Sequence, residues 1–450
     1  MKAKKVISSL ICVVMLVTMV ACTNAPQESE TQTEEQAVTT DGGDGALADA
    51  TISLLSRSFT QNSMYIFEIA HDQLTEWEVE NPGITVVNDS VFDEDQFNNK
   101  FTIAVSSGEI PTIFSHYGGG PFKSYVESGM VLDLEPYLEA DPEWRDSFIE
   151  GAFATTRYPD IEGTYGVPID MFATGIFYNK TIFEECNVEI PETIEEFEAA
   201  CEIFLENGYI PVAFGDKNSF RGGHLLGDVL MKRYGSDFMQ ELAAGERSYT
   251  DPEFIEALEL MKSWQEKGYF GDNVVTLDVD GERTLFRTGK AAMEQHLVTQ
   301  YANIMTDGTL KDEEVGFFQF PYFEEAPEHK NAWHSGTSLL HSIAADASED
   351  EIAAAISLLK MHTSLDTAAK QVEAGEGTFI SALKDAPRPE NPVPALEEFM
   401  AVYPDATDTG KEPGEYEVNP ALRNIIRDQI QAMFAGASPE EVAKVIEAAK

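Results

Sequence analysis

The chain has 450 residues, of which 30 are Lys or Arg and 79 are Asp or Glu, so its formal net charge is −49. A hydrophobic content of 43% indicates a globular protein, and the length indicates two or three domains. The acidic excess excludes nucleic acid and anionic membrane surfaces as main partners, because both are bound by clustered Lys and Arg.

The first 22 residues have the pattern of a secretory signal. A basic start at residues 2–5 precedes an uncharged, mostly apolar run over Val6–Val20, which is too short to span a bilayer. The run ends in MVAC, which resembles the lipobox of bacterial lipoproteins, with Met where Leu is usual. The resemblance implies that Cys22 carries a lipid anchor on the extracellular face of the cytoplasmic membrane. Ordinary secretion with cleavage after a small residue is the alternative.

Residues 23–50 are predicted to form a flexible acidic tether. The segment contains no Lys or Arg, a Gly-rich run at 41–45 and almost no large apolar residue, so it cannot bury a core. Beyond it, no stretch reaches the ~18 consecutive apolar residues of a membrane span.

Two cysteines remain in the body of the chain. Cys201 lies in an apolar stripe with Phe197 and Phe204 at helical spacing, which predicts a buried free thiol. A disulfide with Cys186 is the alternative outside the cell. We expect two free thiols.

The body alternates strand-like runs with amphipathic helices, and Gly108 is predicted to end one of these helices. Capping-box spacing marks three helix starts, at Thr193, Ser348 and Ser438. This alternation predicts an α/β protein with largely parallel sheets. The first predicted elements in chain order are strand Thr51–Leu55, helix Phe67–Glu80, strand Ile84–Asn88, helix Glu94–Ser107 and strand Pro111–Phe114.

Motifs of catalysis and of cofactor binding are absent from the sequence. It contains no HExxH, GxxxxGK[ST], GxSxG, paired CxxC or GxGxxG motif, and its eight histidines are scattered. We therefore expect no catalytic residue, no metal site and no cofactor.

Several blocks in constant order resemble the carbohydrate-type extracellular solute-binding proteins of bacterial ABC importers, the family that includes maltose-binding protein. The resemblance extends from about residue 51 to the C-terminus. The blocks are 97–114 (family pattern KLxxxLASGxxPDVF), 125–134 (YVxAGxLxDL), 163–168 (GKxYGLP), 175–180 (GLFYNK), 191–197 (PxTWDEF) and 285–293 (LFxxGKAAM).

The resemblance implies a two-lobed α/β clamp, like that of periplasmic binding proteins, with crossover strands at Gly166–Phe172 and Val315–Pro321. Behind a signal at 1–22 and a tether at 23–50, the N-lobe would combine 51–168 with 322–385. The C-lobe would combine 169–321 with the terminal helices in 386–450.

The function implied is capture of a mono- or oligosaccharide by hinged closure of a monomer, with delivery to ABC permease subunits and no enzymatic step. A lipid-anchored carbohydrate-active enzyme is one alternative, and the same fold binding a polyol or peptide is another. A phosphate-bearing solute ranks last, because an anion requires converging arginines and only Arg221 lies beside a predicted cleft loop.

Sugars present apolar C–H faces to aromatic rings and hydroxyls to polar side chains, so such residues on loops after strands are the candidates. The resemblance supports Tyr117 as a stacking residue, Asp170 at the crossover and Phe220 in place of a family Trp. Where the family has another stacking Trp this chain has Thr299, so His296 or Tyr301 is expected to replace it. The full candidate set is Phe59, Gln61, Asn88, Asp89, Ser115, His116, Tyr117, Asp170, Phe172, Asp216, Asn218, Phe220, His296, Tyr301, Trp333 and His334, whereas Trp77, Trp144 and Trp264 are expected to be structural.

Overall fold

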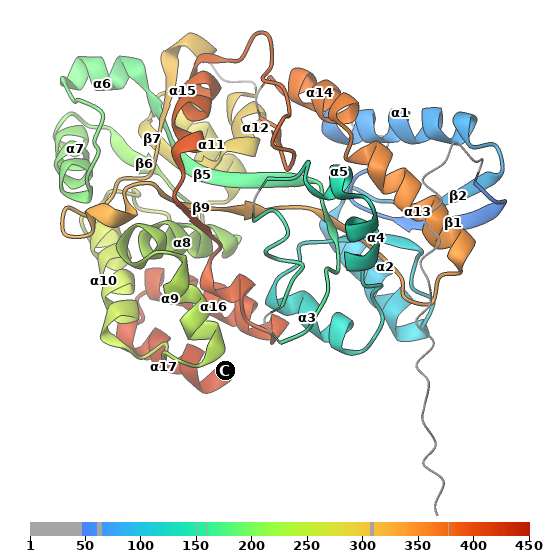
Figure 1. Ribbon diagram of the computed structural model, residues 1–450. Helices are drawn as coiled ribbons and strands as arrows, with labels where there is room; N and C mark the ends of the chain where they lie inside the picture. Colours follow the sequence, from blue (N-terminus) through green and yellow to red (C-terminus); the bar gives the residue numbers. More distant parts are fainter. Residues whose placement is uncertain (1–46, 61–64, 150, 159, 307–309, 377) are drawn as a thin grey trace, which may run out of the picture. The chain divides into compact units, whose positions relative to one another are not determined.

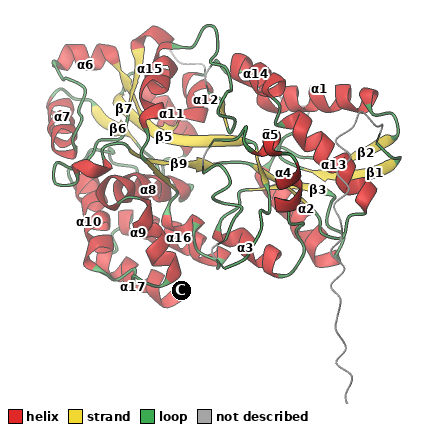
Figure 2. Ribbon diagram, viewed as in Figure 1, coloured by secondary structure: helices red, strands yellow, loops and turns green. Residues whose placement is uncertain are grey.

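The computed structural model describes residues 47–60, 65–149, 151–158, 160–306, 310–376 and 378–450. They belong to one compact unit, Thr40–Lys450 (Figures 1 and 2). The predicted signal with Cys22, the tether up to residue 46 and the candidate Gln61 lie outside the described residues. Within them, no helix has the length and apolar character that a membrane crossing requires.

A five-stranded sheet has the order β2-β1-β3-β10-β4. Strand β1 is parallel to β2 and β3, because α1 (Tyr65–Glu80) and α2 (Glu94–Ser107) return the chain between them, whereas β10 is antiparallel to β3 and β4. The strands are β1 Ala50–Leu55, β2 Ile84–Asn88, β3 Ile113–His116, β4 Val167–Pro168 and β10 Leu340–Ile343.

A second, seven-stranded sheet has the order β12-β9-β5-β7-β6, with β8 and β11 also paired to β5. Its strands are β5 Asp170–Asn179, β6 Ile210–Ala213, β7 Ala291–Leu297, β8 Val315–Phe318, β9 Ala332–Thr337, β11 Ile380–Ser381 and β12 Asp408–Gly410. The prediction of largely parallel sheets is wrong here, because β5 is antiparallel to β7, β8, β9 and β11. Strand β5 runs away from the first sheet while β9 runs back toward it, so these neighbours point in opposite directions.

Short segments carry the chain between the two sheets. Ile169 links β4 to β5, inside the predicted crossover Gly166–Phe172, and residues 338–339 link β9 back to β10. The second passage comes later than the predicted Val315–Pro321, because that segment contains β8, which pairs with β5 inside the seven-stranded sheet.

Helices cover the faces of both sheets (Figure 1). Helix α13 packs on β1 and α1 packs on α13 and α14, while α15, α11 and α8 pack on β8, β7 and β9. The remaining helices are α3 Gly120–Glu127, α4 Glu135–Ala140, α5 Pro142–Arg145, α6 Lys180–Cys186, α7 Ile194–Glu206, α8 Phe220–Tyr234, α9 Ser236–Ala244, α10 Pro252–Glu266, α11 Val279–Arg287, α12 Tyr301–Met305, α13 Glu349–His362, α14 Leu365–Ala374, α15 Pro394–Val402, α16 Pro420–Phe434 and α17 Pro439–Ala449. The 3₁₀ turns are η1 Val298–Gln300, η2 Asp312–Glu314, η3 Pro327–His329, η4 Tyr403–Asp405 and η5 Pro413–Glu415.

Strand β5 is buried on both faces, as its apolar sequence requires. Ile176 and Tyr178 enter the core beneath α8 and α10, whereas Ala173 and Phe177 enter the core that α15 covers, because successive side chains point to opposite faces. The five-stranded sheet has its own core with α1 and α13, which includes Trp77 and Trp144.

Local sequence signals determine the helix ends. Thr193, Ser348 and Ser438 form the predicted capping boxes, each with a Glu three residues later. Gly108 ends α2 in the left-handed conformation (φ 73°). The predicted state of the cysteines is also confirmed, since Cys186 and Cys201 are both free and Cys201 is buried.

Candidate functional site: a cavity lined by both sheets

A cavity of about 550 Å³ lies where strand ends from both sheets meet. Segments that follow β1, β3, β7 and β12 reach it, as is usual in α/β folds, where ligands bind beyond the carboxyl ends of strands. This volume suits a small organic molecule. The lining residues are Arg57, Phe67, Phe92, Tyr117, Asp170, Phe172, Phe220, His224, Leu297, Thr299, Gln300, Asn303, His334, Thr337, Ser338, Leu339, Thr378, Phe379, Lys411, Glu412, Glu415, Arg423 and Arg427.

Five of the residues proposed from the sequence come together in this cavity. They are Tyr117, Asp170, Phe172, Phe220 and His334. Tyr117 follows β3, Asp170 and Phe172 lie at the start of β5, Phe220 begins α8, and His334 lies on β9. Residues far apart in sequence therefore provide three aromatic rings and two polar groups to one space.

Asp170 is held in place by the return passage between the sheets. Its side chain accepts a hydrogen bond from the main-chain N–H of Leu339 at 2.8 Å, and its carbonyl accepts one from Ser338 at 2.8 Å. Burial raises the pKa of Asp170 to about 7, against the opposing effect of the Leu339 N–H and of Lys411. A carboxyl group that titrates near neutral pH thus lines the cavity.

His334 and two aromatic neighbours form a buried corner of the cavity. The His334 ring lies 5.4 Å from that of Phe172, nearly perpendicular to it, and 5.7 Å from that of His224. Phe220 in turn lies 5.3 Å from His224. Burial lowers the pKa of His334 to about 3, so this corner stays neutral at physiological pH.

Tyr117 contacts one cation from each sheet. Arg57, which follows β1, donates to its hydroxyl, and Lys411, which follows β12, donates to its main-chain carbonyl at 3.1 Å. Neither cation was proposed from the sequence. The short segment that forms β12, directly before Lys411, carries no recognisable strand signal, so nothing in the sequence placed Lys411 at the end of a strand.

Next to Lys411, two carboxylates pair with two arginines of α16. Arg427 binds Glu412 and lies 3.4 Å from Glu415, and Arg423 lies 3.2 Å from Glu415. Burial raises the pKa of Glu412, whereas Arg423, Lys411 and Arg427 outweigh burial and lower that of Glu415. These pairs make a largely neutralised wall.

The remaining N-terminal candidates lie away from the cavity lining. Phe59 is buried in the core 4.4 Å from the ring of His362, and His116 stacks on Phe122 at 3.5 Å. Ser115 accepts a hydrogen bond from the N–H of Arg57, so it positions a lining residue without lining the cavity itself. Two others bond locally at the end of β2: Asn88 donates to the carbonyl of Phe59, and Asp89 pairs with Lys100.

The remaining candidates from the second half of the site set also lie outside the cavity lining. Trp333 is buried between Phe399 and Tyr403, and the hydroxyl of Tyr301 donates to Asp312. Asp216 accepts a hydrogen bond from Gly222 at the start of α8, and Asn218 is exposed. The chain after β7 does reach the cavity, but through Leu297, Thr299, Gln300 and Asn303 instead of His296 or Tyr301.

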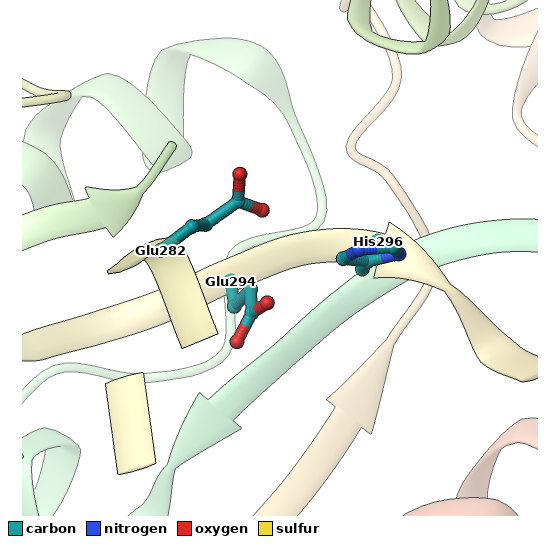
Figure 3. A group of neighbouring side chains, drawn as sticks. All are labelled: Glu282, Glu294 and His296. Atoms are coloured by element: carbon teal, nitrogen blue, oxygen red, sulfur yellow. The ribbon is translucent and has the colours of Figure 1, made fainter. Parts of the chain in front are cut away.

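A fully buried group of Glu282, Glu294 and His296 lies beside this segment (Figure 3), with ligand-type atoms within 4.8 Å of one another. Glu282 is already paired with Arg221 at 2.7 Å, and burial raises the pKa of Glu294 well above its usual value, which favours its neutral form. His296 accepts from the N–H of Leu297 through Nδ1, which puts the imidazole proton on Nε2. A cation would have to displace Arg221 and both protons, so we assign no metal to this group.

Comparison with known proteins agrees with the fold. Residues 66–365 match the family model described as bacterial extracellular solute-binding protein. A binding protein of Brucella abortus is 28% identical over 223 residues, covering 48% of this chain and 51% of the relative. An ABC transporter extracellular-binding protein of Pyrococcus horikoshii is 26% identical over 208 residues, 44% of each chain. The chain spans about half the length of the curated relatives it matches.

A solved structure described as a chitin oligosaccharide-binding protein superposes with a TM-score of 0.78 at 22% identity, covering 89% of this chain and 98% of the other. At that identity the likeness establishes the fold, and it confirms the predicted two-lobed α/β class. The family match covers two thirds of the sequence and includes most of both sheets. The chain is therefore a member of the bacterial extracellular solute-binding protein family.

Proposed function

We propose that this protein captures a mono- or oligosaccharide outside the cell and delivers it to the permease subunits of an ABC importer. One observation carries the proposal: Tyr117, Phe172 and Phe220 line the same cavity as Asp170, Gln300 and Asn303. Aromatic rings match the C–H faces of a sugar, and carboxyl and amide groups match its hydroxyls. The likeness to a chitin oligosaccharide-binding protein supports the same ligand class.

The ligand would close the two lobes by contacting both. Tyr117 follows a strand of the first sheet and Phe220 begins a helix on the second, so a sugar between them contacts both lobes fully only in the closed form. The linking segments at Ile169 and at 338–339 would bend, because they join the two sheets. Small-angle scattering of the monomer should give a smaller radius of gyration with saturating ligand, and an unchanged radius would contradict closure.

A calorimetric titration against a carbohydrate panel tests the ligand class. We expect saturable binding of at least one sugar and no product after extended incubation. Product formation would favour the alternative, a carbohydrate-active enzyme. Binding of a polyol or peptide with no response to any sugar would keep the fold and refute the sugar assignment.

The anchor at Cys22 is a separate part of the proposal. It rests on the short apolar run before Cys22 and on the acidic tether after it. The Cys22→Ala protein should leave the membrane fraction, and mass spectrometry should find the lipid only on the parent protein, which has Cys22. Membrane association of this variant at the level of the parent would contradict lipidation.

A further inference from the structure

The charge of the cavity is opposite to that of the chain. Among the described residues that line it, four are basic (Arg57, Lys411, Arg423 and Arg427) and three are acidic (Asp170, Glu412 and Glu415). The chain as a whole has 30 basic against 79 acidic residues. Removing these cations from water costs free energy, and attraction to a negatively charged ligand would offset that cost.

Lys411 is the residue on which the inference depends. It is 6% exposed, and its ammonium lines the cavity with one hydrogen bond, to the carbonyl of Tyr117 at 3.1 Å. Its other close contact is the face of the Phe172 ring, 5.8 Å away. Among the described residues, no carboxylate oxygen lies within 4.0 Å of the Lys411 ammonium, so Lys411 forms no ion pair there. Burial lowers the pKa of Lys411, while Glu415 and Asp170 favour its charged form from beyond ion-pair distance. With one hydrogen bond made, the ammonium keeps donors that a ligand can use.

Unlike Lys411, the nearby arginines of α16 already have carboxylate partners. Arg423 and Arg427 are engaged with Glu412 and Glu415, so they position the wall behind Lys411. Arg57 reaches the same Tyr117 from the first sheet. The two cations on either side of Tyr117 therefore belong to different lobes, and an anionic group between them would attract both.

We infer that the cognate ligand is a saccharide with a singly charged acidic group, a carboxylate or a sulfate ester, which binds Lys411 with Arg57 nearby. This deepens the proposed function and rests on it. It also reverses the sequence argument that only Arg221 could serve an anion, because Arg221 is buried against Glu282, away from the cavity lining, while four other cations line the cavity.

Matched ligands test the inference directly. Calorimetry on the full mature chain would compare digalacturonate, its neutral dimethyl ester, neutral digalactose and a monosulfated disaccharide. We expect an acidic ligand to bind at least about 10-fold more tightly than its neutral counterpart. The advantage should shrink as salt rises, since screening weakens charge attraction. Comparing the affinities of digalacturonate and the monosulfated disaccharide decides whether the site prefers a carboxylate or a sulfate ester.

Variants locate the effect. Lys411→Met should reduce the ratio of acidic-ligand to neutral-ligand affinity at least about 10-fold, and Lys411→Arg should restore much of that ratio. Lys330→Met, at an exposed lysine paired with Glu192, is the matched control and should change neither affinity. If Lys411→Met does not fold, Arg57→Gln provides the same comparison from the other lobe.

The outcomes separate this inference from the function on which it rests. Equal affinity for the acid and its ester, or an unchanged preference in Lys411→Met, would overturn the acidic-saccharide inference and leave sugar binding intact. If no saccharide binds, acidic or neutral, the proposed function itself fails.

Discussion

The ammonium of Lys411 donates a hydrogen bond to the main-chain carbonyl of Tyr117, a residue 294 positions earlier in the chain. Tyr117 extends the first sheet and Lys411 extends the second, so this one bond joins the two halves of the cavity wall. Both residues line the cavity, so one ligand there can contact the charge of Lys411 and the ring of Tyr117. Recognition of charge and stacking on an aromatic surface are therefore combined at one place.

Phe220→Ala and Tyr117→Ala should each weaken saccharide binding by about 2 kcal/mol or more, close to 30-fold, because a buried stacking residue dominates binding energy whereas a rim residue does not. Calorimetry at equal protein stability measures this. Tyr322→Ala, which removes an aromatic ring from beside Lys330 and outside the cavity lining, is the control and should bind as the parent does. Unchanged affinity in both cavity variants would place the aromatic surface elsewhere, with Phe67, Phe92 and Phe379 the next residues to test.

Glu282→Ala should destabilise the fold by about 3–5 kcal/mol, because it leaves the guanidinium of Arg221 charged and unpaired in the core. Both side chains are 0% exposed and lie 2.7 Å apart. Urea denaturation measures the loss. The matched control is Lys217→Ala, which breaks an exposed pair with Asp278 of 3.0 Å and should cost less than about 1 kcal/mol. Similar losses for the two variants would show that burial does not determine the cost.

The stability of the protein should fall with rising pH between about pH 6 and pH 8, partly because of Asp216. Burial raises the pKa of Asp216 from 3.8 to about 8, so the folded state holds this proton more tightly than the unfolded chain. Its stabilising contribution is complete below the unfolded pKa and is lost as pH rises through 8. A single such group changes the free energy of unfolding by on the order of 1 kcal/mol per pH unit.

Asp216→Asn cannot titrate, so urea denaturation at a series of pH values should show a smaller fall for this variant. Asp278→Asn is the control. The pKa of Asp278 is lowered, chiefly by its hydrogen bond to Lys217, so it stays ionised throughout this range and its removal should leave the slope unchanged. A slope equal to that of the parent in Asp216→Asn would contradict the assignment.

Binding of an acidic saccharide should strengthen as pH falls from about 8 to 6, because protonation of Asp170, whose pKa is about 7, removes a negative charge from the cavity. The charged groups that act on Asp170 are Lys411 and Arg57. His334, which also lines the cavity, has a pKa of about 3, so it stays neutral over this range. In Asp170→Asn the affinity should be nearly independent of pH. Isothermal titration at several pH values checks this, and binding of the acidic ligand that weakens toward pH 6 would contradict the role of Asp170.

Much of the local structure could be read from the sequence. Strand β2 and helix α2 have the predicted bounds, and the capping boxes at Thr193 and Ser438 begin helices as expected. These signals are local, since a cap or a periodic apolar face depends on residues within a few positions of one another. The family blocks are equally local, which is why the fold class followed from them.

The composition of the cavity was predictable only in part. Residues directly after strong strands, such as Tyr117, were found. Successive side chains of a strand point to opposite faces, however, and the sequence did not show that His296 is buried whereas Leu297 lines the cavity. His116 and Phe59 have the right chemistry for a sugar and are instead enclosed by core rings. Which of two adjacent side chains faces the ligand is decided by the packing around them.

The sequence by itself determined the first helices and strands, the α/β class, the free thiols and the membership of a solute-binding family. Only the tertiary structure decided which charges face the cavity. Arg221, the one arginine that sequence position had favoured, is buried against Glu282. The cavity is lined instead by four cations from distant parts of the chain: Arg57, Lys411, Arg423 and Arg427. The physical reason is that the electrostatic character of a site is a sum over neighbours in space, and such neighbours leave no mark on the local pattern of the chain.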